Sequence, residues 1–133
     1  PRDADPPPKG ARRTALSLQV RAMEKGSKEE SSVRRNVIDA FSNLLERLDK
    51  IYSGSEAPDE FIDRINFWNT ACGLPDAIAK ELHTLRKWSN VSRHYSTEPG
   101  RWKREGPRGD KAAELIESLD AQVSDLEARV AGT

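Results

Sequence analysis

The chain has 133 residues, 35% of them hydrophobic and 33% charged, which is enough for one domain with a lean hydrophobic core. Its 22 basic and 22 acidic residues cancel, and this balance argues against a protein that binds nucleic acid through its overall charge. The single cysteine, Cys72, excludes an internal disulfide and a thiolate metal cluster, and it favours a reducing, intracellular compartment.

The sequence carries no sign of a membrane segment or a metal centre. No stretch approaches the roughly 20 apolar residues of a membrane-spanning helix, and no signal-peptide core is visible. The two histidines have no acidic cluster beside them, so we expect no bound metal, and no motif calls for a cofactor. The chain begins at Pro1 rather than methionine, which favours a piece of a larger polypeptide.

Residues 1–10 are rich in proline and charge and lack apolar periodicity, so they are expected to form a flexible lead-in. A first helix is predicted over residues 11–25, with three apolar side chains on one face. The strongest helical pattern covers residues 28–53, where apolar residues recur every three or four positions. Those positions are Val33, Val37, Phe41, Leu44, Leu48 and Ile51.

A third helix is predicted from Pro58, because a proline followed by two acidic residues is typical of a helix start. It runs to about Cys72, since Gly73 stops it, and it places Phe61, Ile65, Trp68 and Cys72 on one side. A fourth helix opens at Pro75 and ends close to Tyr95. Its inward positions are Ile78, Leu82, Leu85 and Trp88.

Residues 96–109 contain the pairs Pro99-Gly100 and Gly106-Pro107, which interrupt helices, so this segment is predicted to be a loop. A last helix starts near Asp110, and its apolar residues alternate at four and three positions, close to a coiled-coil seam. Those residues are Ala112, Ile116, Leu119, Val123, Leu126 and Val130.

No segment shows sustained alternation of apolar and polar residues at period two, so no sheet is expected. The predicted fold is therefore all-α: an antiparallel bundle of four or five helices, because short connections make neighbouring helices run in opposite directions. We expect a single domain over residues 11–133, preceded by the lead-in.

The densest chemistry lies in residues 82–94, which hold both histidines, three cations, an asparagine and a tryptophan. On a helix, Arg86, Asn90 and His94 are four residues apart and fall along one stripe, which can hold a phosphate or act on one. Each polar residue also has a structural interpretation. A histidine at a helix C-terminus is favoured by the helix dipole, and an asparagine can bond the local backbone.

Charge is segregated along the chain. Residues 86–108, here called the basic segment, hold seven basic and two acidic residues and carry +5, so the rest of the chain carries −5. A surface of this kind suits a phosphate or an acidic partner. Trp88, Tyr95 and Trp102 interleave with the cations, as a stacking surface for single-stranded nucleic acid requires. The alternative is that Trp88 belongs to the core and that Trp102 pins the following loop onto the bundle.

The order of the elements and one motif resemble the HEPN superfamily, helical domains named for nucleotide binding in higher eukaryotes and prokaryotes. The resemblance covers about residues 32–130, from a long helix to a closing amphipathic helix. Its motif consists of Leu85-Arg86, Asn90 and His94, which occupy positions of the family's signature Leu-Arg-x-x-Arg-Asn-x-x-x-His.

In active members, this signature implies a metal-independent ribonuclease: an arginine stabilises the phosphate and a histidine transfers protons while the ribose 2′-hydroxyl attacks. The resemblance also implies that two subunits meet along this helix. The sequence departs from the family at Ser89, which stands where the signature has its second arginine. Lys87 supplies charge without the bidentate geometry of a guanidinium. We therefore expect the family's shape without its nuclease chemistry.

The favoured hypothesis is a non-enzymatic HEPN-like module of a larger protein that forms a homodimer or binds a protein partner through the basic segment. One alternative is a metal-independent endoribonuclease with His94 as acid and base and Arg86 or Lys87 holding the phosphate. The other is binding of RNA or a nucleotide without cleavage. The candidate binding residues are Lys87, Asn90, Arg93, Arg101, Trp102, Lys103, Arg104 and Arg108.

Overall fold

The structure, a computed structural model, describes residues 30–54 and 56–132. They form five helices: α2 (Glu30–Ile51), α3 (Phe61–Ala71), α4 (Asp76–Arg93), α5 (Pro99–Glu105) and α6 (Lys111–Ala131). These residues contain no strand, which confirms the all-α prediction for the described part of the chain. The predicted lead-in at residues 1–10 and the predicted helix at residues 11–25 lie outside the described residues.

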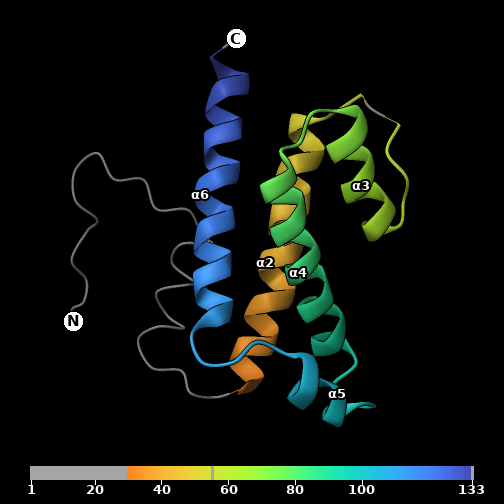
Figure 1. The fold of residues 1–133 in the computed structure, drawn as a ribbon, viewed down its shortest axis with the longest axis vertical. Helices are drawn as coiled ribbons and strands as arrows, with labels where there is room; N and C mark the ends of the chain where they lie inside the picture. The colour runs from red at the N-terminus through yellow and green to blue at the C-terminus, as the bar shows by residue number, and fades with distance from the viewer. Residues whose placement is uncertain (1–29, 55, 133) are drawn as a thin grey trace, which may run out of the picture.

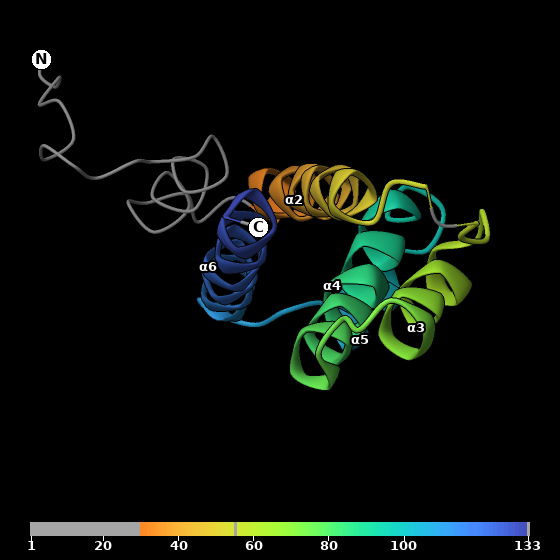
Figure 2. The same ribbon diagram turned by 90° about the horizontal axis from the view of Figure 1, so that it is seen from above.

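Helix α4 is the centre of the bundle, and it contacts each of the other four helices. Its direction is opposite to that of α2, α3 and α6, as the colour order along the ribbons shows (Figure 1). Seen from above, α2, α4 and α6 stand at the three corners of a triangle, and α3 lies on the side of α4 away from α6 (Figure 2). The predicted antiparallel bundle is therefore confirmed. None of the described helices is both long enough and apolar enough to cross a membrane.

The hydrophobic core forms where the apolar stripes of the helices meet, as their periodicity predicts. Trp68 of α3 and Phe41 of α2 are the largest fully buried side chains. The other buried apolar positions that the sequence predicted are Val37, Leu44, Leu48, Ile65, Ile78, Leu82, Leu85, Ala112, Ile116, Leu119 and Val123. Four helices thus contribute the side chains that the sequence patterns assigned to the interior.

Several predicted inward positions lie closer to the surface. Phe61 is 38% exposed because it sits in the first turn of α3, at the edge of the bundle. Val130 is 51% exposed in the last turn of α6. Trp88, Leu126 and Cys72 are only partly buried and pack against the core. The apolar periodicity of the sequence therefore predicts the burial of residues in the middle of a helix better than that of residues near its ends.

The prediction of a loop over residues 96–109 is wrong for the middle of this segment, residues 99–105, which form α5. Pro99 occupies the first turn of this short helix, where a proline costs no hydrogen bond because the first amides of a helix have no partner there. Trp102 then anchors the helix to the bundle and is only 4% exposed. The pair Pro99-Gly100, which was predicted to interrupt a helix, thus starts α5, and the buried Trp102 ring holds α5 in place.

Substitution of Gly106 by alanine is expected to destabilise the protein by about 2 kcal/mol through overpacking. A Cβ at Gly106, directly after α5, would lie 2.6 Å from the carbonyl oxygen of Trp102 and 2.8 Å from a carbon of its ring. Gly100→Ala is the matched control, because its Cβ would meet only the end of the Arg104 side chain. Urea denaturation of both variants measures the effect. Equal stability of the two variants would show that the Trp102 ring of α5 is not tightly packed against Gly106.

A polar cluster joins α2 to α6. The guanidinium of Arg47 donates to Asp120 at 2.7 Å, to Ser124 at 2.9 Å and to Glu127 at 2.8 and 3.1 Å. Burial lowers the pKa of Arg47, but the hydrogen bonds that Arg47 donates to Glu127 and Asp120 and the negative charges of these two residues outweigh it, so the pKa is raised overall. The cationic side chain of Arg47 on α2 is therefore bound by acceptors on α6.

Candidate functional site

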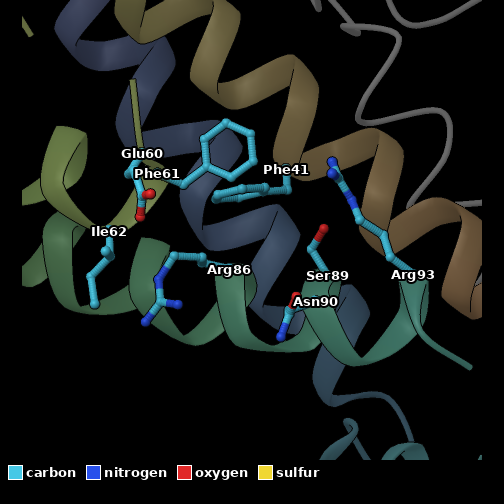
Figure 3. A pocket seen from close by; sticks show the side chains of 8 residues that line it. All are labelled: Phe41, Glu60, Phe61, Ile62, Arg86, Ser89, Asn90 and Arg93. Atoms are coloured by element: carbon cyan, nitrogen blue, oxygen red, sulfur yellow. The ribbon is translucent and has the colours of Figure 1, made fainter. Parts of the chain in front are cut away.

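A hollow of about 200 Å³ opens between the first turn of α3 and the second half of α4. Its lining combines apolar rings with cations, as Figure 3 shows. The lining residues are Phe41, Glu60, Phe61, Ile62, Arg86, Ser89, Asn90 and Arg93. Three helices thus contribute to one concave site, and α4 supplies its polar side.

The apolar part of the hollow follows from the way α3 begins. The Phe61 ring stands edge-on to the buried Phe41 ring of α2, with the ring centroids 5.3 Å apart and an interplanar angle of 85°. Phe61 and the neighbouring Ile62 are 38% and 43% exposed, and they are two of the three exposed large hydrophobic residues in the described part of the chain. An apolar surface is therefore presented directly beside the polar side chains of α4.

Only part of the predicted Arg86–Asn90–His94 stripe faces the hollow. Arg86 and Asn90 line it, but His94 does not; the third position is taken by Arg93, whose guanidinium carbon lies 5.8 Å from the centroid of the Phe61 ring. Seven residues turn a helix through about 700°, which is about 20° short of two turns, whereas eight residues overshoot by about 80°. Residues spaced by four along a helix therefore rotate progressively away from the face on which the first of them lies. His94 is the exposed C-cap residue of α4.

Arg86 is held by a partner that the sequence analysis did not single out. Its Nε donates to Nδ1 of His83 at 3.3 Å, and the other ring nitrogen of His83 lies 2.9 Å from Oδ1 of Asn66 on α3. A guanidinium can only donate, so Nδ1 accepts, and the neutral ring carries its proton on Nε2 and donates to Asn66. Arg86 and His83 are three residues apart, which is a detectable helical spacing. Asn66 becomes their partner only when α3 packs on α4.

The pKa of His83 lies below its ordinary value of 6.5 because burial and the charges of Arg86 and Lys87 disfavour protonation. In the window between this lowered pKa and 6.5, the unfolded chain binds more protons than the folded one. Acidification through that window therefore lowers the free energy of unfolding, and the contribution of neutral His83 is complete above 6.5.

This linkage predicts that the stability advantage of the wild type over His83→Gln shrinks as the pH falls from about 7 to about 5. Protonation breaks the acceptor site for Arg86, whereas glutamine does not titrate. Urea denaturation of both proteins at several pH values measures the difference. A difference that stays constant over this range would contradict the assigned tautomer.

Ser89 occupies the position at which the family signature has its second arginine. It is only 2% exposed, yet it lines the hollow, and its hydroxyl makes no hydrogen bond with any other residue that the structure describes. In Figure 3 the hydroxyl points toward the space between the Phe41 ring and Arg93. The hydroxyl is open to the hollow and free of hydrogen bonds to other described residues, which makes it a candidate contact for a bound group.

The basic segment is less uniform than its composition indicates. Arg101 lies between Glu98 and Glu105, at 3.6 and 3.5 Å, so its charge is partly neutralised. Four further cations are exposed and form no ion pair with another residue of the described ranges. These are Lys87, Lys103, Arg104 and Arg108.

The three aromatic residues of the basic segment differ in how much of each ring is accessible. The Trp102 ring is buried, as in the interpretation that it pins this segment to the bundle. The guanidinium of Arg34 covers one face of the Tyr95 ring, with its central carbon 3.5 Å from the ring centroid. Trp88 is partly buried and packs against the core. Stacking on bases needs exposed ring faces, so this arrangement gives it little support.

Within the described ranges, no group of three or more His, Cys, Asp or Glu side chains is arranged to hold a metal ion. Comparison of the chain with known protein families, with characterised proteins and with solved structures finds no match. The geometry of the hollow and the charges around it therefore provide the basis for inferring a function.

Proposed function

We propose that this chain is a non-enzymatic, HEPN-like binding module, and that it docks an acidic segment of a protein partner on the basic segment. The observation that supports this most is that Arg86 and Arg93 share a hollow with exposed Phe61 and Ile62 while His94 lies outside its lining. Neither arginine has a carboxylate partner among the described residues, so both are available to an incoming anion.

The surface around the hollow supports an extended partner. Lys87 is exposed on α4, and Lys103, Arg104 and Arg108 continue the positive charge onto α5 and the turn after it. Exposed cations of this kind accelerate encounter with an acidic chain and add modest affinity that salt screens. The hollow adds an apolar contact, which gives a protein segment more to bind than charge alone.

The two alternatives find less support in the geometry. Phosphodiester cleavage by Arg86 and His94 requires both side chains at one phosphate, with the imidazole within hydrogen-bond reach of the proton it transfers. His94 is not part of the lining that holds Arg86. Binding of single-stranded RNA is favoured by exposed aromatic rings among the cations, and Trp102 is buried while Tyr95 is covered. An acidic protein segment fits the available groups better.

Fluorescence anisotropy with three labelled probes tests the proposal: an acidic peptide containing leucine, the same peptide with lysine in place of each glutamate, and oligouridylate. We expect the acidic peptide to bind, with an affinity that falls as the salt concentration increases and that is lower still for the Lys103→Glu variant. Lys80→Glu is the control, because Lys80 is exposed near the start of α4, outside the basic segment.

The proposal fails if the acidic peptide does not bind at low salt, or if oligouridylate binds more tightly than the peptide. Sedimentation velocity of the chain alone tests the other form of the hypothesis, in which the same surface makes a homodimer. A dimer that Lys103→Glu dissociates and Lys80→Glu does not would assign the surface to self-association.

A further inference from the structure

We propose that the hollow is a socket for one apolar side chain of the partner together with the carboxylate next to it. This inference rests on the proposed function and specifies the chemical unit that the hollow recognises. It adds a requirement that charge alone does not impose: the partner's acidic residue must adjoin a leucine-like or aromatic residue.

The size and the apolar wall of the hollow suit a single side chain. Its volume of about 200 Å³ is below the roughly 300–1,000 Å³ that is typical of pockets for whole small molecules. Phe41 closes the hollow from below and is 1% exposed, while Phe61 and Ile62 remain partly open to solvent. Covering these two side chains removes apolar surface from water, and that burial favours binding.

The polar wall of the hollow suits one carboxylate. Arg86 supplies a guanidinium donor and Asn90 an amide on the same side of α4, while Arg93 adds positive charge at the other end of the hollow (Figure 3). Arg86 is restrained by His83, so less side-chain freedom is lost when an anion binds. The Ser89 hydroxyl lines the hollow, makes no hydrogen bond with another residue of the described ranges, and can donate to a carboxylate oxygen.

Glu60 limits the charge that the hollow accepts. It is the single acidic residue of the lining and forms no ion pair with any other described residue. Its carboxylate repels a second negative charge and accepts a hydrogen bond from a backbone amide of the partner. A carboxylate therefore fits better than a phosphate, which carries between about one and a half and two charges when attached to a side chain.

The test uses two acidic peptides of equal charge, one with a leucine beside its central glutamate and one with serine at that position. We expect the leucine peptide to bind about tenfold more tightly to the wild type. Ile62→Ser should abolish most of that preference. Val130→Ser is the matched control, because Val130 is the third exposed large hydrophobic residue of the described ranges and lies on α6.

Ser89→Ala separates a binding role from a structural one. Because the Ser89 hydroxyl makes no hydrogen bond with another described residue, its removal should leave the stability nearly unchanged, yet weaken binding of the leucine peptide several-fold. Unchanged affinity in Ser89→Ala, or equal affinity of the two peptides for the wild type, would overturn the socket. Salt-sensitive binding of both peptides would then still support the basic segment as a docking surface. Absence of binding by either peptide would remove both proposals.

Discussion

Substitution of Arg47 by leucine is expected to lower the free energy of unfolding by about 3 kcal/mol. The change removes the four hydrogen bonds that Arg47 of α2 donates to side chains of α6, one of them to the buried carboxylate of Asp120. Breaking one side of a buried ion pair is costly because the remaining charge has lost its solvation. Chemical denaturation monitored by circular dichroism measures the loss.

Two comparisons isolate the cause. Arg35→Leu removes an exposed arginine from the same helix and should change the stability by no more than about 0.5 kcal/mol. The double variant Arg47→Leu/Asp120→Leu should recover part of the loss, because the more deeply buried of the two carboxylates bonded to Arg47 is removed as well. If Arg47→Leu were as mild as Arg35→Leu, the polar cluster would contribute nothing to the packing of α2 on α6.

The double variant Arg86→Glu/Arg93→Glu is expected to bind the acidic leucine peptide at least about thirtyfold more weakly than the wild type, a loss of about 2 kcal/mol. Both guanidinium donors of the hollow become acceptors that repel the ligand. Isothermal titration calorimetry measures the loss. The fold should remain intact, since neither side chain belongs to the hydrophobic core.

A milder substitution tests the geometry of the same donors. Arg86→Lys keeps the positive charge but loses the planar fork and the bond to His83, so its affinity should lie between those of the wild type and the double variant. Lys80→Glu should bind almost as well as the wild type. If Arg86→Lys bound as tightly as the wild type, the fork would not be needed.

The long helices of the bundle were predictable because each is specified by a pattern of residues that lie close together in the sequence. Apolar residues at helical spacing locate α2, α3, α4 and α6, and Pro58, Gly73 and Pro75 lie close to their boundaries. The pattern failed for α5, where two breaker pairs bracket a single buried anchor, Trp102. One apolar residue gives no periodicity, so only its tertiary contacts identify the short helix.

The candidate site was predictable in part for the same reason. Arg86 and Asn90 share a face because their spacing is local to α4. Arg93, and not His94, completes this face of α4. The reason is that a helix has 3.6 residues per turn, so residues spaced by four gradually rotate away from the starting face. The bond between His83 and Asn66 crosses from α4 to α3, as the bonds of Arg47 cross from α2 to α6. Such contacts depend on how helices pack and leave no pattern within one segment.

The most direct test of where the partner binds is a titration of isotope-labelled protein with the acidic leucine peptide, followed by backbone amide NMR spectra. We expect the largest changes in backbone amide chemical shift at Phe61, Ile62 and residues 86–93 of α4, with smaller changes on α5. Changes concentrated on α6, or on α5 alone with α3 unaffected, would contradict it.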